Sequence, residues 1–271
     1  MPDRLSLAVD VGNSRIKFGV FEWALPNQGR PRLPECCASQ AVSIAEKFDW
    51  EGILAHFEKW SPALQTAAIA GANPRAMEMI LSSWPGAVWP LPFALRQAAE
   101  LPLCVKVQFP NQVGIDRLLD AIAANVLRPP TAPVVVVDSG TATTVDLISS
   151  SGAFEGGAIL PGLELGARAL HQYTALLPLI DVQALLTSPV AAVGRNTIEA
   201  IQSGIWFGQI GSIRELVAQL TETAGQPPVV LVTGGNGRWL ASSISHRLER
   251  EVLFEPDLAL RGLAYVAQSA K

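Results

Sequence analysis

Apolar residues along this chain gather in short runs that end at polar turns, and the first run predicts a β-hairpin. Residues 7–20 read LAVDVGNSRIKFGV, in which an apolar strand ends at Asp10 and a polar turn leads into a returning strand. Residues 134–149 read VVVVDSGTATTVDLIS and repeat this order of features. Asp138 lies 128 residues after Asp10, close to half the length of the 271-residue chain. We therefore predict a duplicated domain in which each half opens on a hairpin.

Strands alternate with amphipathic helices over the rest of the chain. Apolar residues spaced three or four apart predict helices, and short apolar runs bounded by turn residues predict strands. The predicted helices cover Trp50–Trp60, Ala76–Ser83, Leu118–Leu127, Leu163–Gln172, Thr197–Glu222 and Leu258–Gln268. Further strands are predicted over Cys36–Ser43, Ala67–Ala70, Ala87–Leu91 and the start of Val229–Leu240, with a loop over Ala24–Glu35 and a turn over Gly156–Gly162. This alternation favours an α/β layer architecture.

Length and composition limit the kind of protein that this chain can be and the kinds of partner that it can bind. The duplication favours two domains, and Arg128-Pro129-Pro130 marks a boundary, so we expect domains over residues 1–130 and 131–271. A net charge of −4 with scattered basic residues predicts no nucleic-acid partner. The apolar runs are too short for a membrane span, and the first residues resemble no signal peptide. Three cysteines without a pairing or metal-binding pattern favour a reducing cytoplasm.

The first hairpin has the chemistry of a phosphate-binding turn. Gly12 has no Cβ, so a phosphate can approach its backbone closely. Asn13 and Ser14 offer donors, the turn amides can form an anion-binding concavity, and Lys17 adds a positive charge. Asp10 can hold Mg²⁺ directly or through water. An ordinary hairpin with a polar turn is the alternative, and the repeat at Asp138 argues against it.

A second candidate site lies at the start of the helix predicted from Leu118. The preceding residues 108–117 read QFPNQVGIDR, which places Asp116 and Arg117 near the helix N-terminus, where an anion is favoured. Asp116 is suited to accept a proton from a substrate hydroxyl, and Arg117 to grip a carboxylate. A helix N-cap is the alternative role for Asp116.

Weaker signals follow in the second half of the chain. Thr197, in the sequence Gly-Arg-Asn-Thr, is placed either to cap the long helix or to bind substrate. Gly204, Gly208 and Gly211 form a ridge on that helix that suits close packing against a neighbour in the chain or a dimer partner. A Gly-Gly turn after the strand from Val229 suits a nucleotide contact.

These motifs, in this order, resemble those of type III pantothenate kinases, within the superfamily of actin, sugar kinases and Hsp70. The matching segments are Asp10–Lys17, Gly114–Arg117, Asp138–Asp146, Gly156–Gly162, Gly194–Thr197 and Val232–Gly235. The resemblance covers essentially the whole chain. It implies duplicated ribonuclease H-like (actin-like ATPase) domains, with mixed sheets flanked by helices and an active site in the cleft between the domains.

The resemblance also implies roles for individual residues. Pantothenate would be bound by Gly114, Ile115, Asp116, Arg117 and Thr197, with Asp116 as the general base. ATP and its Mg²⁺ would be bound by Asp10, Val11, Gly12, Asn13, Ser14, Arg15, Ile16, Lys17 and Thr141. Asp138 would bind a monovalent cation, K⁺ or NH₄⁺. The implied protein is a cytoplasmic homodimer that phosphorylates pantothenate with ATP in the first step of coenzyme A synthesis.

One departure and two alternatives accompany this resemblance. Family members often carry a tyrosine at the position of Val107, and nearby Phe109 replaces its ring but not its hydroxyl. The alternatives are an inactive relative that serves as an accessory factor for gene expression and a kinase for another small hydroxy acid. An inactive protein is disfavoured because a non-catalytic role has no chemical need for four residues that are all present: Asp10, Lys17, Asp116 and Asp138.

Overall fold

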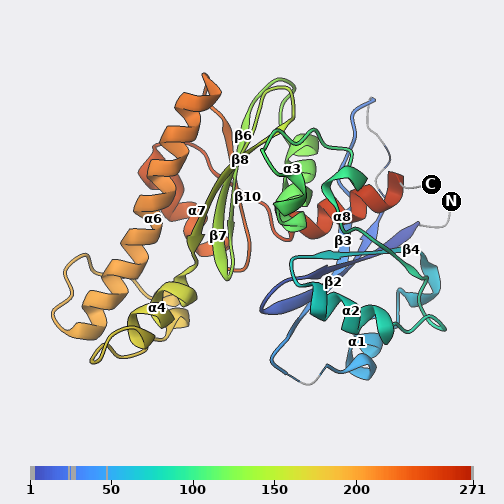
Figure 1. Ribbon diagram of the computed structural model, residues 1–271, viewed down its shortest axis with the longest axis horizontal. Helices are drawn as coiled ribbons and strands as arrows, with labels where there is room; N and C mark the ends of the chain where they lie inside the picture. Colours follow the sequence, from blue (N-terminus) through green and yellow to red (C-terminus); the bar gives the residue numbers. More distant parts are fainter. Residues whose placement is uncertain (1–3, 24, 26–28, 47, 270–271) are drawn as a thin grey trace. The chain divides into compact units, whose positions relative to one another are not determined.

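The computed structural model describes residues 4–23, 25, 29–46 and 48–269, which form two compact units. The first unit contains the described residues up to Pro129, the short segment Gly152–Phe154 and the chain from Asp257 onward. The second contains Pro130–Ser151 and Glu155–Pro256. Each unit is built on one five-stranded sheet (Figure 1).

The first unit has the strand order β3-β2-β1-β4-β5. Strands β1 and β2 form the predicted hairpin and β3 continues it antiparallel, whereas β4 and β5 run parallel to β1. The strands are β1 (Leu5–Val11), β2 (Arg15–Glu22), β3 (Glu35–Ser43), β4 (Leu64–Gly71) and β5 (Pro92–Ala94). The helices are α1 (Trp50–Phe57), α2 (Pro74–Ser82), α3 (Ile115–Leu127) and α8 (Leu258–Ser269), with 3₁₀ turns at Ser61–Ala63, Ala98–Glu100 and Pro110–Gln112.

Helices cover both faces of this sheet. Leu7, Val9 and Phe18 pack with Ile53 of α1 and Ile80 of α2 in one buried cluster. Successive side chains of a strand point to opposite faces, so Asp10 lies on the other face, where α8 packs (Figure 1). Helix α8 also packs along α3, which ties the end of the chain to the helix that carries the Asp116 motif.

The second unit repeats this plan with the strand order β10-β9-β6-β7-β8. Strands β6 and β7 form an antiparallel hairpin, while β9 and β10 run parallel to β6. The strands are β6 (Val134–Ser139), β7 (Ala142–Ile148), β8 (Phe154–Pro161), β9 (Val229–Thr233) and β10 (Leu253–Phe254). The helices are α4 (Leu163–Gln172), α5 (Val182–Thr187), α6 (Thr197–Ala224) and α7 (Gly237–Leu248). Helices α6 and α7 pack on one face of this sheet.

Three predicted segments differ from the structure in their type or in the unit to which they belong. Ala87–Leu91 is not a strand, because the amides of Val88 and Trp89 both donate to Pro85 O and form a turn, and the strand follows at Pro92. The glycine-rich segment Gly156–Gly162 is mostly strand β8 rather than a turn. The last helix, expected in the second domain, packs in the first unit. The loop predicted over Ala24–Glu35 lies partly outside the described residues.

Candidate active site

The first hairpin turns tightly after Asp10. The Gly12 amide donates to Arg15 O over 3.0 Å, and a Cβ at Gly12 would lie 3.1 Å from that oxygen. Asn13 and Ser14 are exposed at the turn. Asp10 and Lys17 are directly paired in the ladder, so their side chains leave the same face of the sheet about 5 Å apart at Cβ. The turn therefore offers amides, polar side chains and one ammonium group near a carboxylate.

Not every residue of this segment can offer its side chain to a ligand. The side chains of Val11 and Ile16 are fully buried in the core, so only their main chains are available. The end of β4 supports the turn from beneath: a Cβ at Gly71 would lie 2.2 Å from Val11 O, and the Asn73 amide donates to the same oxygen over 3.3 Å.

Lys17 has an ionic partner that the sequence did not predict. Its Nζ lies 3.5 Å from Oδ1 of Asp257, the residue that precedes α8. The two residues are 240 positions apart in the chain, so no local pattern connects them. Only the packing of α8 against the first sheet brings them together.

Asp116 lies in the first turn of α3, as predicted, but it is not the N-cap. The cap is Gly114, which provides no side-chain hydrogen bond. Asp116 Oδ1 accepts a hydrogen bond from the Arg117 amide over 2.9 Å. A Cβ at Gly114 would lie 2.5 Å from that same Oδ1, so glycine leaves room for the carboxylate. The Arg117 guanidinium lies over the Phe154 ring, 5.5 Å from its centroid, which fixes the direction of the side chain.

The second hairpin has the same backbone plan with different chemistry. Asp138 is paired with Thr144, whose Oγ1 is buried and has no hydrogen-bond partner among the described residues. The Gly140 amide donates to Ala142 O over 2.9 Å and closes the turn. Thr141 is exposed there, and its carbonyl oxygen accepts from the Gly162 amide over 3.1 Å.

The predicted Gly-Gly turn after β9 closes over the end of β6. Gly234 has a φ of 87°, in the left-handed region that favours glycine. A Cβ there would lie 2.2 Å from Asp138 Oδ1 and 2.5 Å from Ser139 O. The carboxylate of Asp138 therefore rests directly against the backbone of this turn.

The oxygen atoms around Asp138 suit a cation whose remaining ligands come from a bound substrate. Carboxylate, hydroxyl and carbonyl oxygens are the ligands that hard cations prefer. Among the described residues no group of three or more His, Cys, Asp or Glu side chains is placed to hold a metal ion by itself. An ion here would need phosphate, water or backbone oxygens to complete its shell.

Thr197 is the first residue of α6 and not its cap. Asn196 is the N-cap, because its side chain accepts from the Glu199 amide over 2.9 Å, while the Glu199 carboxylate accepts from the Arg195 amide over 2.8 Å. The Thr197 side chain is exposed and therefore available to a ligand. A Cβ at Gly194 would lie 2.2 Å from Ala200 N, so the preceding loop folds tightly onto this helix start.

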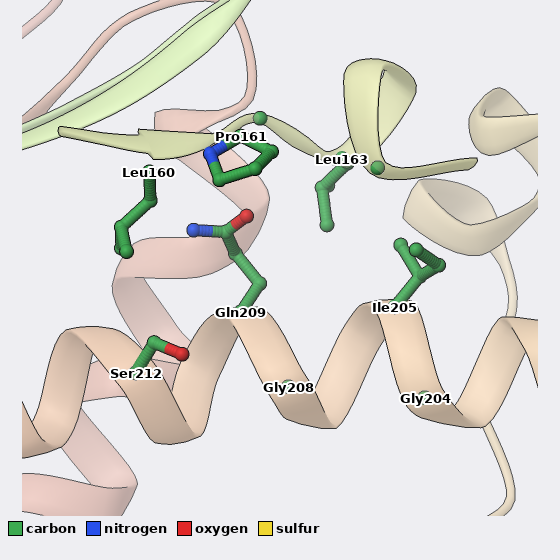
Figure 2. A pocket seen from close by; sticks show the side chains of 10 residues that line it. Leu160, Pro161, Leu163, Gly204, Ile205, Gly208, Gln209 and Ser212 are labelled. Atoms are coloured by element: carbon green, nitrogen blue, oxygen red, sulfur yellow. The ribbon is translucent and has the colours of Figure 1, made fainter. Parts of the chain in front are cut away.

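A groove of about 190 Å³ lies between α6 and the turn that joins β8 to α4 (Figure 2). Leu160, Pro161 and Leu163 form one wall, and Gly204 and Gly208 of α6 form the other. None of the side chains predicted to bind substrate or metal lines it. The described part of the chain contains no helix long and apolar enough to span a membrane.

Comparisons of sequence connect this chain to one family. The model of the type III pantothenate kinase family matches residues 6–219. A type III pantothenate kinase of Dehalococcoides mccartyi strain CBDB1 is 32% identical over 270 residues, which cover 98% of this chain and 96% of the relative. One from Caulobacter vibrioides is 40% identical over 172 residues, 64% of this chain and 63% of the relative.

Comparisons of structure concern the fold. The activator of the 2-hydroxyisocaproyl-CoA dehydratase from Clostridium difficile, solved with bound ADPNP, has a TM-score of 0.54 at 12% identity, over 98% of this chain and 94% of that one. The (R)-2-hydroxyglutaryl-CoA dehydratase component A of Acidaminococcus fermentans has a TM-score of 0.54 at 16% identity, over 98% and 99%. The expected actin-like ATPase fold, with mixed sheets flanked by helices, is confirmed.

Proposed function

The chain belongs to the type III pantothenate kinase family, and we propose on this basis that it transfers the γ-phosphate of ATP to the primary hydroxyl of pantothenate. The product is 4′-phosphopantothenate, and the reaction is the first step of coenzyme A synthesis. The observation that carries the proposal is the family match over residues 6–219, because this range contains both hairpins and the Asp116 motif.

We propose that Asp116 is the general base. Its carboxylate accepts the proton of the pantothenate hydroxyl while the hydroxyl oxygen forms a bond to the γ-phosphorus and the bond to the β-phosphate oxygen breaks. The hydrogen bond from the Arg117 amide, at 2.9 Å, fixes one carboxylate oxygen and leaves the other for the substrate. Arg117 and Thr197 are proposed to bind pantothenate, with Gly114 and Ile115 beside them.

The turn from Asp10 to Lys17 is proposed to bind the ATP phosphates. The amide-rich turn and the Lys17 ammonium offset the negative charge of the phosphates, and exposed Thr141 offers a further contact. Asp10 suits the Mg²⁺ that accompanies ATP, and Asp138 with Thr144 suits a monovalent cation, K⁺ or NH₄⁺. Such cations, when bound, neutralise phosphate charge.

We further propose that the protein is a homodimer. Large apolar side chains are exposed in the second unit at Ile159, Leu165, Tyr173, Leu176, Val193 and Ile198. A Cβ at Gly204, Gly208 or Gly211 would meet nothing within 4 Å, so there is room at these positions for another backbone to approach closely. A second copy would bury both features. Light scattering should report twice the mass of one chain, and a monomer at micromolar concentration would contradict the proposal.

The central test is ADP release with a panel of hydroxy acids, pantothenate included, in the presence of Mg²⁺ and K⁺. We expect turnover with pantothenate, and Asp116→Asn should lower kcat by roughly 10²–10⁴-fold. Asparagine keeps the oxygen that accepts from the Arg117 amide, so the fold should be intact by circular dichroism. Asp49→Asn, which alters only the cap of α1, is the matched control and should be fully active. No turnover with pantothenate would overturn the proposal, and turnover with another member of the panel would reassign the substrate.

A further inference from the structure

The ion pair of Lys17 comes from the far end of the chain. Lys17 Nζ and Asp257 Oδ1 are 3.5 Å apart, with 29% and 32% of their side chains exposed. Asp257 lies outside residues 6–219, the range that the family model matches. The pair joins the phosphate-binding hairpin to the start of α8.

Asp257 is held by rigid surroundings. Its carbonyl oxygen accepts from the Arg261 amide over 3.0 Å, so it directly precedes the first turn of α8. The helix is anchored by fully buried Leu258 and Leu263, and at Gly262 it lies against the backbone of α3. Asp257 has a φ of 50°, a left-handed conformation that aspartate and asparagine tolerate better than most residues. The position of its carboxylate is therefore set by the packing of α8.

The Lys17 side chain leaves the sheet on the same face as that of Asp10, and its ammonium group is at the end of a flexible four-carbon stem. An unrestrained ammonium would sample many rotamers, and a nucleotide would have to order it upon binding. A fixed carboxylate beside the ammonium group removes part of this entropic cost of ordering the side chain before the nucleotide binds.

We infer that Asp257 is a positioning residue that orients Lys17 for the nucleotide phosphates. This inference rests on the proposed function, since it takes the hairpin from Asp10 to Lys17 as the phosphate site. Asp257 itself does not touch the substrate in this role, and it acts only through the lysine.

The test is the affinity of the Asp257→Asn protein for a non-hydrolysable ATP analogue with Mg²⁺, measured by calorimetry without pantothenate. Asparagine has the same shape and tolerates the same φ, so the change removes the charge and leaves the backbone in place. Since the ion pair is partly exposed, we expect binding to weaken by about two- to fivefold. KM for pantothenate and the melting temperature should not change. Asp49→Asn, a carboxylate change at the start of α1, is the matched control and should bind the analogue as the unaltered protein does.

A double-mutant cycle separates positioning from a general effect of charge. In a Lys17→Ala background, Asp257→Asn should have no further effect on analogue binding, because the side chain through which it acts is gone. Unchanged or tighter binding by the single variant Asp257→Asn, or the same weakening in both backgrounds, would overturn the inference.

The outcomes also separate this inference from the proposed function. If the unaltered protein binds the analogue but does not phosphorylate pantothenate, the proposed substrate is wrong, and the cycle still decides the role of Asp257. If it phosphorylates pantothenate and Asp257→Asn has no effect on binding, only the inference is wrong. If it binds no nucleotide, both are overturned.

Discussion

Replacing Gly262 by alanine should destabilise the first unit, because α8 touches the backbone of α3 at this residue. A Cβ at Gly262 would lie 2.2 Å from Leu119 O and 2.9 Å from Leu119 C. Carbon and carbonyl oxygen normally approach no closer than about 3.3 Å, so the two helices would have to separate by about 1 Å. Leu119 is fully buried, and a rigid helix backbone cannot rotate away as a side chain would.

The size of the effect follows from two opposing contributions. Overpacking of a well-packed core costs about 1–3 kcal/mol. Alanine is favoured over glycine in a helix interior by about 1 kcal/mol, which offsets part of that cost. Because the added Cβ would meet rigid backbone atoms, the upper part of that range applies, about 2–3 kcal/mol. After the offset we expect the free energy of unfolding to fall by about 1–2 kcal/mol, which corresponds to a melting temperature lower by about 2–8 °C.

Thermal denaturation followed by circular dichroism measures this change. Gly86→Ala is the matched control in the same unit, because the nearest atom to its added Cβ would be Leu91 Cδ2 at an ordinary 3.5 Å. The control should stay within about 0.5 kcal/mol of the unaltered protein. A Gly262→Ala protein as stable as the control would refute the close contact between α3 and α8.

Two further predictions concern the cation and a cysteine. Replacing K⁺ by a bulky organic cation at equal ionic strength should abolish most kinase activity, and Asp138→Ala should remove the response to added K⁺; indifference to the monovalent ion would contradict the role of Asp138. Loss of solvation, and then the negative charges of Asp257 and Cys37, raise the pKa of the Cys36 thiol. The thiol therefore keeps its proton to a higher pH in the folded chain than in the unfolded chain. Its contribution to the free energy of unfolding falls as the pH rises through the alkaline range. With Cys37 and Cys104 replaced by serine, Asp257→Asn should lower the pKa of Cys36 and speed its alkylation at pH 8; an unchanged rate would contradict the proximity of the two groups.

Local patterns in the sequence predicted much of the fold. Apolar runs that end at Asp10 and Asp138 predicted both hairpins, because strand pairing across a short turn depends on neighbouring residues. The position of Asp116 at a helix start was correct for the same reason, although the helix begins at Ile115 rather than Leu118. The cap at Asn196 instead of Thr197 is a shift by one residue, of the kind that propensity alone does not resolve.

Contacts between distant segments could not be predicted in this way. The pair of Lys17 and Asp257 depends on the return of α8 to the first unit. The contact of Gly234 with Asp138 depends on β9 pairing in parallel with β6, after a long excursion through α6. In both cases the sequence showed a plausible residue or turn, but only tertiary packing decides what it touches.

The duplicated hairpins show how one backbone plan can come to carry different chemistry. In the first, Asp10 is paired with Lys17, whereas in the second Asp138 is paired with Thr144, so the second turn is shorter by one residue and has a hydroxyl where the first has an ammonium group. Within the part of the chain that the structure describes, that hydroxyl is buried without a hydrogen-bond partner, an arrangement that costs about 1–3 kcal/mol unless a ligand satisfies it. The first turn thus has the ammonium group of Lys17 beside its carboxylate, whereas the second has the hydroxyl oxygen of Thr144 beside its carboxylate. A phosphate bound near such oxygens needs a positive charge from solution, which is the physical reason to expect the proposed monovalent cation at Asp138.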